Sequence, residues 1–243
     1  MSANLNLILR GVRSEKVKVF TSATKPLLLP FYYRNKGDDT DQPNTFTMMF
    51  KTGDDMRQDQ LVLQLFSIMD RVLKDVNLDC KFTIYDLIAF TTDDGLLPFV
   101  PDSDTITAIL KEHKSIGAYL KSHAKDDEDY ERILDNYIVS CAGYCTATYL
   151  LGIGDRHLEN LMITKDGMFF HIDFGFIFGK EPGSKGRLAS KFRISKDMVT
   201  PMGGVGSANY AKFSQKFVET FLILRNKISY ILNLMHLMIH SGI

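Results

Sequence analysis

Two kinds of apolar spacing divide this chain. In the first hundred residues, short runs rich in apolar and β-branched residues are separated by Pro, Gly, Asn and Asp, which is typical of strands joined by turns. These runs occupy residues 16–20, 27–34, 45–51, 81–90 and 96–100, the last two around a turn at 93–95. Residues 56–76 instead repeat their apolar positions every three or four residues, which predicts a helix. We therefore expect a small antiparallel sheet with one long helix packed on it.

From residue 103 onward the pattern becomes helical. It predicts helices over residues 103–111, 115–122, 129–151 and 207–238. The helix over 129–151 is apolar on most sides after Ile138, so we expect it at the centre of its lobe. The charged stretch AKDDEDYE before it predicts a surface connection with a helix start, and residues 179–200 predict a loop rich in Gly, Ser, Lys and Arg.

Together these elements predict an α+β fold with two lobes. Residues 1–100 would form the smaller lobe, an antiparallel sheet plus one helix, and residues 101–243 a mostly helical larger lobe. An extended crossing near residues 99–103 would join them, with a nucleotide expected in the cleft between the lobes.

Composition narrows the possible functions only a little. The 243 residues are 45% hydrophobic, and 29 basic residues balance 29 acidic ones, so no net charge draws the chain to nucleic acid. No apolar run reaches the roughly 18 residues of a membrane-spanning helix, and the first residues are too polar for a signal peptide. Cys80, Cys141 and Cys145 are expected to be buried free thiols in a reducing compartment.

The chemistry of the chain is concentrated in residues 152–175, GIGDRHLENLMITKDGMFFHIDFG. Asp155-Arg156-His157 with Asn160, and then Asp173-Phe174-Gly175, flank a short apolar hairpin. Transfer of a phosphoryl group from ATP needs oxygen ligands for Mg²⁺ and an acid/base group nearby. Asn160 and Asp173 supply such oxygens. The residues therefore predict a kinase site, with these two side chains as metal ligands.

Three segments carry a resemblance to a known family: FKTGDDMRQDQLVLQ, SCAGYCTATYLLGIGDRHLENL and FHIDFGFIFG. The chain resembles the catalytic domain of the phosphatidylinositol 3- and 4-kinase superfamily from about residue 8 to its end. The SCAGYC helix points to the class III phosphatidylinositol 3-kinases, the vacuolar protein sorting type. The resemblance implies a protein-kinase-like fold whose last helices are truncated here, because catalytic domains of the family continue for several helices beyond Ile243.

The resemblance also implies an ATP-binding set. Lys51, at the end of a strand, would contact the phosphates as a flexible point charge, and Asp59 on the following helix would steady it. Ser22, in the turn 22–26, would cover the phosphates with its hydroxyl and the neighbouring backbone N–H groups. The remaining residues of the set are Tyr85 at the back of the adenine pocket and Phe99 and Val100 in the hinge that would bond adenine.

In the catalytic loop, Asp155 and His157 both qualify as the base, and the residues leave the choice open. Histidine titrates near neutral pH and suits the transfer of a hydroxyl proton, whereas an aspartate would orient that hydroxyl. The family favours His157 as the direct participant with Asp155 as its partner. We expect Arg156 to brace the loop and His171 to be structural.

The loop from Gly175 to Met198 is expected to select the lipid headgroup. Its segment 180–196 carries six cations against one acid, Glu181, and four of these cations form the candidate headgroup contacts: Lys185, Arg187, Lys191 and Arg193. Class III relatives have prolines and fewer basic residues there. The excess charge would pair with anionic lipid, at about 1 kcal/mol per residue, or admit a phosphorylated headgroup. The alternative is a surface loop whose charge only solubilises it.

These observations predict a lipid kinase that uses ATP and Mg²⁺ (or Mn²⁺) to phosphorylate the 3-hydroxyl of phosphatidylinositol, with phosphatidylinositol 3-phosphate serving endosomal trafficking and autophagy. It would be cytoplasmic and peripheral on endosomal or autophagic membranes. Its partners would be membrane phosphatidylinositol and the regulatory subunits of a class III complex, without nucleic acid. The alternatives are a phosphatidylinositol 4-kinase or related protein kinase, and a non-catalytic nucleotide-binding scaffold.

Overall fold

The computed structural model describes residues 7–20, 25–35, 44–183 and 193–236. The chain divides into two compact units, each described here by itself. Unit 1 contains Met1–Leu63 and Tyr85–Val100, and unit 2 contains Gln64–Ile84 and Pro101–Ile243. In this division residues 64–84 group with unit 2, although the sequence prediction placed them in the first lobe. The reason is packing, because Phe66 and Phe82 lie against Tyr144 in the core of unit 2.

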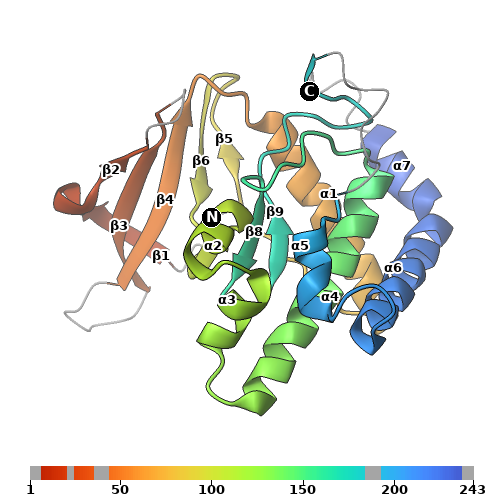
Figure 1. Ribbon diagram of the computed structural model, residues 1–243. Helices are drawn as coiled ribbons and strands as arrows, with labels where there is room; N and C mark the ends of the chain where they lie inside the picture. Colours follow the sequence, from red (N-terminus) through yellow and green to blue (C-terminus); the bar gives the residue numbers. More distant parts are fainter. Residues whose placement is uncertain (1–6, 21–24, 36–43, 184–192, 237–243) are drawn as a thin grey trace. The chain divides into compact units, whose positions relative to one another are not determined.

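Unit 1 is built on one antiparallel sheet (Figure 1). Among the described residues, its strands follow the order β1-β3-β4-β6-β5, and β2 pairs with β3. The bounds are β1 Leu7–Val12, β2 Lys18–Val19, β3 Leu27–Asn35, β4 Asn44–Thr52, β5 Ile88–Ala89 and β6 Asp94–Pro98, with a 3₁₀ turn η1 at Ser14–Lys16. The helix α1, Arg57–Lys74, starts in unit 1 and confirms the helix predicted over 56–76.

A proline inside β3 shows how the sheet accommodates a residue without an N–H group. β3 pairs with β2 up to Leu28 and with β1 from Phe31 onward. Pro30 lies between these two ladders, where a missing donor costs little. Its carbonyl still accepts a hydrogen bond from the amide of Arg13 at 2.8 Å. The proline thus marks the point at which β3 changes partner.

Unit 2 surrounds one buried helix. The bounds of its helices are α2 Ile106–His113, α3 Ile116–His123, α4 Asp127–Leu150, α5 Lys196–Val199, η3 Thr200–Met202, α6 Ala208–Asn226 and α7 Ile228–His236. Strands β7 Ser103–Thr105, β8 Leu161–Thr164 and β9 Phe169–His171 form a small antiparallel sheet in the order β7-β8-β9. Helix α4 packs against α6 and β9, and its residues from Tyr137 to Ala147 are buried, as the sequence predicted (Figure 1).

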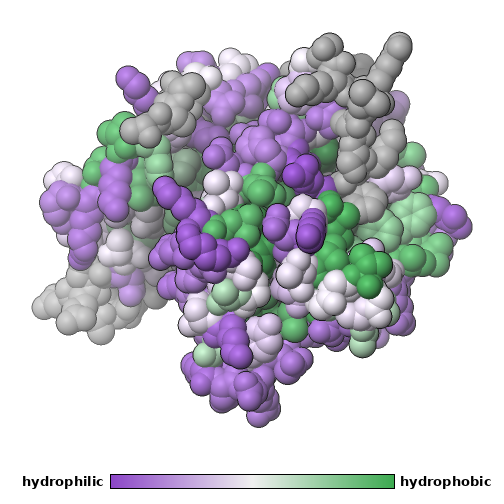
Figure 2. All heavy atoms as spheres, viewed as in Figure 1, coloured by the Kyte–Doolittle hydropathy of each residue, from purple (hydrophilic) through white to green (hydrophobic). Residues whose placement is uncertain are grey.

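Side-chain caps set several helix starts in unit 2. Thr105, Ser115 and Asp126 each accept a hydrogen bond from the backbone amide three residues later. Such caps satisfy amides that lack a partner in the first turn. Asp126 lies inside the charged connection AKDDEDYE, which confirms the predicted helix start there. Hydrophilic side chains cover this end of α3 and α4 in Figure 2.

Some local predictions from the sequence were wrong, and one strand was missed. Residues 103–105 begin as strand β7, paired with β8, before the helix starts. Residues 81–90 contain strand only at Ile88–Ala89. Their residue types suggested a strand, but Cys80 and Phe82 pack on α4 at Gly143 rather than in a sheet. The helix predicted over 207–238 is divided at Lys227 into α6 and α7. Strand β1 was not predicted at all.

The fold is α+β with antiparallel sheets, as the sequence predicted. Within the described part of the chain, no helix combines the length and apolar character that crossing a membrane requires.

Candidate active site

The loop after α4 is fastened to the segment that follows Asp173. The amide of Gly154 donates to the carbonyl of Phe176 at 2.9 Å, and the amide of Phe178 donates to the carbonyl of Leu151 at 2.8 Å. Gly179 donates in the same way to Gly152, also at 2.8 Å. At Gly152 a Cβ atom would lie 2.7 Å from the nitrogen of Gly179, so the close approach requires glycine. These bonds bring the two polar clusters of the sequence side by side.

Arg156 reinforces the same junction with its side chain. Its guanidinium is 9% exposed and donates to the carbonyls of Gly154 at 2.7 Å and Ile172 at 2.8 Å, and also to the carbonyl of Asp173. The group lies over the ring of Phe174, 5.7 Å from its centroid. These three hydrogen bonds are directed to backbone carbonyls. The expected bracing role of Arg156 agrees with these contacts.

Asn160 and Asp173 lie at neighbouring ends of the β8–β9 hairpin. Asn160 directly precedes β8, and Asp173 follows the end of β9 after one intervening residue, Ile172. The amide of Ile172 donates to the carbonyl of Asn160 at 3.1 Å. The Nδ2 atom of Asn160 donates to the carbonyl of Asp155 at 3.0 Å. That bond fixes which end of the side-chain amide carries the oxygen. The hairpin thus joins both predicted metal ligands through backbone contacts.

The donor set fits Mg²⁺. Asn160 offers an amide oxygen, and the exposed Asp173 offers a carboxylate whose Oδ1 accepts, from the described residues, a long 3.4 Å hydrogen bond from the amide of Gly175. Mg²⁺ is usually held by one or two such oxygens together with substrate phosphates and water, rather than by a complete protein cage. Accordingly, no group of three or more His, Cys, Asp or Glu residues suited to a metal occurs among the described residues.

Asp155 and His157 face each other loosely. The Nε2 atom of His157 lies 3.9 Å from Oδ2 of Asp155, which is too long for a hydrogen bond. Their side chains are 33% and 52% exposed, so both reach solvent or a bound substrate. Asp155 has a φ of +54°, a left-handed conformation that costs a non-glycine residue about 1 kcal/mol or more. Surrounding contacts must therefore hold its backbone.

His171 is a fully buried polar residue near the site. It is 1% exposed, and its ring stacks on Tyr144 with a centroid separation of 5.3 Å. Burial, with the nearby charge of Arg156, holds the pKa of His171 well below its ordinary value. Neither ring nitrogen has a hydrogen-bond partner within the described protein. A neutral imidazole in this position acts as an aromatic core residue, in keeping with the structural role expected for it.

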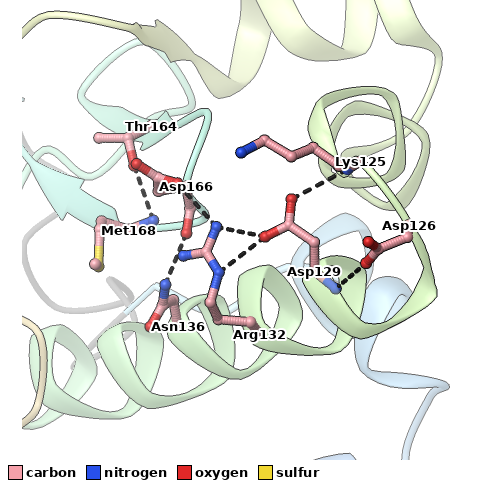
Figure 3. A network of polar contacts seen from close by, with 8 residues as sticks. All are labelled: Lys125, Asp126, Asp129, Arg132, Asn136, Thr164, Asp166 and Met168. Atoms are coloured by element: carbon pink, nitrogen blue, oxygen red, sulfur yellow. Dashed lines mark hydrogen bonds and ion pairs between the residues drawn. The ribbon is translucent and has the colours of Figure 1, made fainter.

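A polar network ties the far end of the hairpin to α4 (Figure 3). Arg132 pairs with Asp129 at 2.7 Å and with Asp166, in the β8–β9 turn, at 3.1 Å. The Nδ2 atom of Asn136 donates to the carbonyl of Asp166 at 2.9 Å. One helical turn later, the buried Ser140 accepts a hydrogen bond from the amide of Phe169 at 2.9 Å. A stripe of polar residues on α4 thereby fixes the position of the hairpin.

Glycine 167 completes this contact. Its φ is +83°, and a Cβ atom there would overlap the carbonyl oxygen of Ile133 on α4. The turn of the hairpin can approach the helix only because this residue has no side chain.

In unit 1, Lys51 lies near the end of β4, opposite Gly95 of β6. Its ammonium group bonds to Asp54 at 3.3 Å. The Lys51 side chain is half-buried, and that of Asp54 is exposed. The predicted partner, Asp59, lies in the first turn of α1 and has an interaction of its own. The roles of Lys51 in phosphate binding and of Asp59 in steadying it stay predictions, and Asp54 is a contact that the sequence did not indicate.

Three other predicted ATP-binding residues of unit 1 make contacts within the protein. The amide of Phe99 donates to the carbonyl of Thr47 on β4 at 3.0 Å, so this N–H is already used. Tyr85 and Val100 are half-buried, and each has an interaction within the protein. An adenine-binding role for the remaining backbone groups of Phe99 and Val100 stays a prediction.

Several predicted residues lie outside the described part of the chain. They are Ser22 in the predicted phosphate-covering turn and Lys185, Arg187 and Lys191 in the predicted headgroup loop. Arg193, the fourth candidate headgroup contact, is described and exposed. Its carbonyl accepts a hydrogen bond from the Sγ atom of Cys145 at 3.7 Å. Burial raises the pKa of that thiol to about 12, so it remains protonated and able to donate.

Comparisons with known proteins agree with this geometry. Residues 45–243 match the family model for phosphatidylinositol 3- and 4-kinase. The chain belongs to this family. It is 42% identical over 242 residues to phosphatidylinositol 3-kinase VPS34 of Arabidopsis thaliana and 40% identical over 242 residues to the protein of that name in Saccharomyces cerevisiae. It is also 40% identical over 250 residues to phosphatidylinositol 3-kinase pik3 of Schizosaccharomyces pombe.

These matches cover nearly all of the chain but only part of each relative. They include 98% of the chain for the first two proteins and 100% for the third, yet 28%, 26% and 30% of the relatives' own lengths. The kinase-like α+β fold predicted from the resemblance is therefore confirmed by family membership together with the observed sheets and helices.

Sequence reasoning missed two features of this family site. One is the polar stripe on α4, which was visible as Arg132, Asn136 and Ser140 spaced by four residues in an otherwise apolar helix. The other is Glu181, which the sequence showed only as the lone acid in a basic loop. In the structure its carboxylate accepts a hydrogen bond from the amide of Asp155.

Proposed function

We propose that this chain is the catalytic part of a phosphatidylinositol 3-kinase, which transfers the γ-phosphate of ATP to the 3-hydroxyl of phosphatidylinositol. The observation that carries the proposal is the cross-braced arrangement of Asp155, Asn160 and Asp173 in a chain of this family. The names of the most similar relatives support the lipid and the position of the hydroxyl.

The protein's share of the reaction is positioning and charge stabilisation. Phosphoryl transfer through a loose transition state asks for little covalent chemistry from the enzyme. Asn160 and Asp173 would hold Mg²⁺, which, when bound, neutralises charge on the phosphates. Lys51 would contribute a further positive charge to the phosphates of ATP. The inositol oxygen forms a bond to the γ-phosphorus as the bond to ADP breaks, and the hydroxyl proton leaves to a base.

The base is drawn from Asp155 and His157. In our proposal His157 accepts the proton, because its ring is exposed and histidine titrates near neutral pH. Asp155 lies 3.9 Å away and would stabilise the imidazolium that forms. A mutant pair separates the roles. His157→Gln should shift the pH dependence of kcat, whereas Asp155→Asn should lower kcat without the same shift in its pH dependence.

The cellular setting belongs to the same proposal. A product made for endosomal trafficking and autophagy would place the chain on the cytoplasmic face of those membranes as a peripheral protein. Basic residues of the loop from Gly175 to Met198, including Arg193, would contact anionic lipid or the headgroup, and regulatory subunits of a class III complex would be its partners. The VPS34 name of the relatives supports this setting.

The first experiment measures turnover of radiolabelled ATP on phosphatidylinositol vesicles, with and without Mg²⁺, followed by identification of the product isomer. We expect a metal-dependent 3-phosphate. A 4-phosphate would overturn the assignment in favour of a 4-kinase, and labelled protein without labelled lipid would indicate a protein kinase.

A matched pair of variants separates an enzyme from a scaffold. Asp173→Ala should lower turnover by about 10³-fold or more by removing a metal ligand, with little change in the melting temperature. Asp102→Ala removes an exposed carboxylate paired with Lys165 and should leave turnover unchanged. Wild-type protein that binds ATP but transfers no phosphate under any metal condition would contradict the proposed activity.

A further inference from the structure

Glu181 lies beside the catalytic loop although it is 26 residues away in the sequence. Its Oε2 atom accepts a hydrogen bond from the backbone amide of Asp155 at 2.9 Å, and its side chain is half-buried. The bond joins a carboxylate to a backbone N–H, which makes it stronger than a neutral hydrogen bond. Glu181 is thus a specific partner of the catalytic loop rather than a solvated surface charge.

The local sequence makes room for this carboxylate. A Cβ atom at Gly154 would overlap the carbonyl oxygen of Lys180 and would lie 2.9 Å from Oε1 of Glu181. Any other residue at position 154 would push Glu181 away from the amide that it accepts. The absent side chain and the placed carboxylate therefore form one arrangement.

The contact continues from Glu181 to a predicted metal ligand. Both backbone groups of Asp155 are hydrogen-bonded. Its N–H donates to Glu181, and its carbonyl accepts from Nδ2 of Asn160 at 3.0 Å. The amide of His157 donates to the same carbonyl at 3.1 Å. One peptide segment thus connects Glu181 to both base candidates and to the side chain of Asn160.

The conformation of Asp155 explains why such a partner is needed. With a φ of +54°, the residue is outside the backbone region that its side chain favours. Strained conformations persist only where neighbouring contacts enforce them. In the described structure, Glu181 supplies the contact on the N–H side.

We propose that Glu181 is a positioning residue, which holds the strained backbone of Asp155 so that Asp155, His157 and Asn160 keep their reactive orientation. The proposal rests on the lipid kinase activity proposed above. It assigns to Glu181 no contact with substrate or metal.

The experiment compares three variants of the full 243-residue chain. Glu181→Ala removes the acceptor, Glu181→Gln keeps an amide oxygen able to accept the same bond, and Glu131→Gln removes an equivalent charge from an exposed position on α4. The first readout is amide hydrogen exchange resolved at Asp155. The second is kcat and the KM for ATP on phosphatidylinositol vesicles. A thermal melt reports whether each variant is folded.

We expect Glu181→Ala to accelerate exchange at Asp155 by about 10-fold or more and to lower kcat by about 10- to 100-fold, with the KM for ATP changed less than about threefold. Glu181→Gln should stay within about threefold of wild type in both readouts, and Glu131→Gln should match wild type.

Two results would overturn the proposal. One is unchanged exchange at Asp155 in Glu181→Ala. The other is equal loss of kcat in the Ala and Gln variants, which would assign the effect to charge rather than to the hydrogen bond. If wild-type protein makes no phosphorylated lipid, the proposed activity fails, and exchange at Asp155 still decides the role of Glu181.

Discussion

The region of the predicted metal ligands in unit 2 and the region around Lys51 in unit 1 are held by different kinds of contact. Around Asn160 and Asp173, buried groups bond to backbone: Arg156 donates to three carbonyls and Ser140 accepts from Phe169. Within the described residues, Lys51 forms a partly exposed ion pair with Asp54. Metal ligands and acid/base groups must be placed within fractions of an ångström, so their supports are rigid. A lysine that follows phosphates on a long flexible stem needs less support.

The largest expected effect is at the centre of the braced region. Arg156→Leu should lower the free energy of unfolding by about 3 to 5 kcal/mol, because it leaves buried carbonyls without their donor. Urea unfolding measures this loss. The control, Arg132→Leu, removes a half-exposed guanidinium and should cost about 1 kcal/mol or less. Similar losses for the two variants would contradict the contrast between buried and exposed contacts.

A second change tests the close contact between the β8–β9 turn and α4. Gly167→Ala should cost about 2 to 3 kcal/mol, since the new Cβ meets the carbonyl of Ile133 at a φ of +83°. Gly204→Ala has a similar φ of +86° and no atom within 4 Å, so it should cost about 1 kcal/mol. The difference in melting temperature between the variants isolates the steric contact. Equal costs would show that the hairpin can move away from the helix.

A third change tests the buried hydroxyl under β9. Ser140→Ala leaves the amide of Phe169 without its acceptor and should cost about 2 kcal/mol in the free energy of unfolding. Thr148→Val removes another buried hydroxyl of α4, whose bonds to described residues go to carbonyls of the same helix, and should cost about 0.5 kcal/mol. Denaturant titration of both proteins gives the comparison. A cost for Ser140→Ala no larger than that for Thr148→Val would remove the hydroxyl from the bracing network.

The smallest effect is expected in unit 1. Asp54→Ala breaks the ion pair with Lys51 but should change the free energy of unfolding by less than about 0.5 kcal/mol. The KM for ATP should change by less than about threefold, because the lysine keeps its charge and its freedom of movement. Lys51→Met provides the contrast and should raise that KM by about 10-fold or more. A strong effect of Asp54→Ala would mean that the ion pair positions the lysine after all.

Local sequence was enough for much of the fold and for the predicted chemistry. The strands over 27–34 and 45–51 and the helix over 56–76 were found because their apolar spacing has a fixed period. Asn160 and Asp173 could be predicted as metal ligands because the loop and the hairpin that bears them are continuous in the chain. Each of these features lies within about twenty consecutive residues.

Other features depended on contacts that leave no periodic trace. Residues 81–90 have the residue types of a strand, yet those types specify only a half-covered surface, and α4 rather than a neighbouring strand covers Phe82. The break of the last predicted helix at Lys227 likewise left no signal in the apolar pattern.

The sequence by itself determined the fold class, the family and the identities of the predicted metal ligands and base candidates, because these follow from local spacing and short motifs. Only the tertiary structure decided that Arg156 bonds to three backbone carbonyls, that Ser140 supports the hairpin and that Glu181 accepts from the amide of Asp155. The physical reason is that a hydrogen bond between a side chain and a distant backbone group depends on which distant segments the fold brings into contact. The local pattern of residues around the side chain does not specify that backbone group.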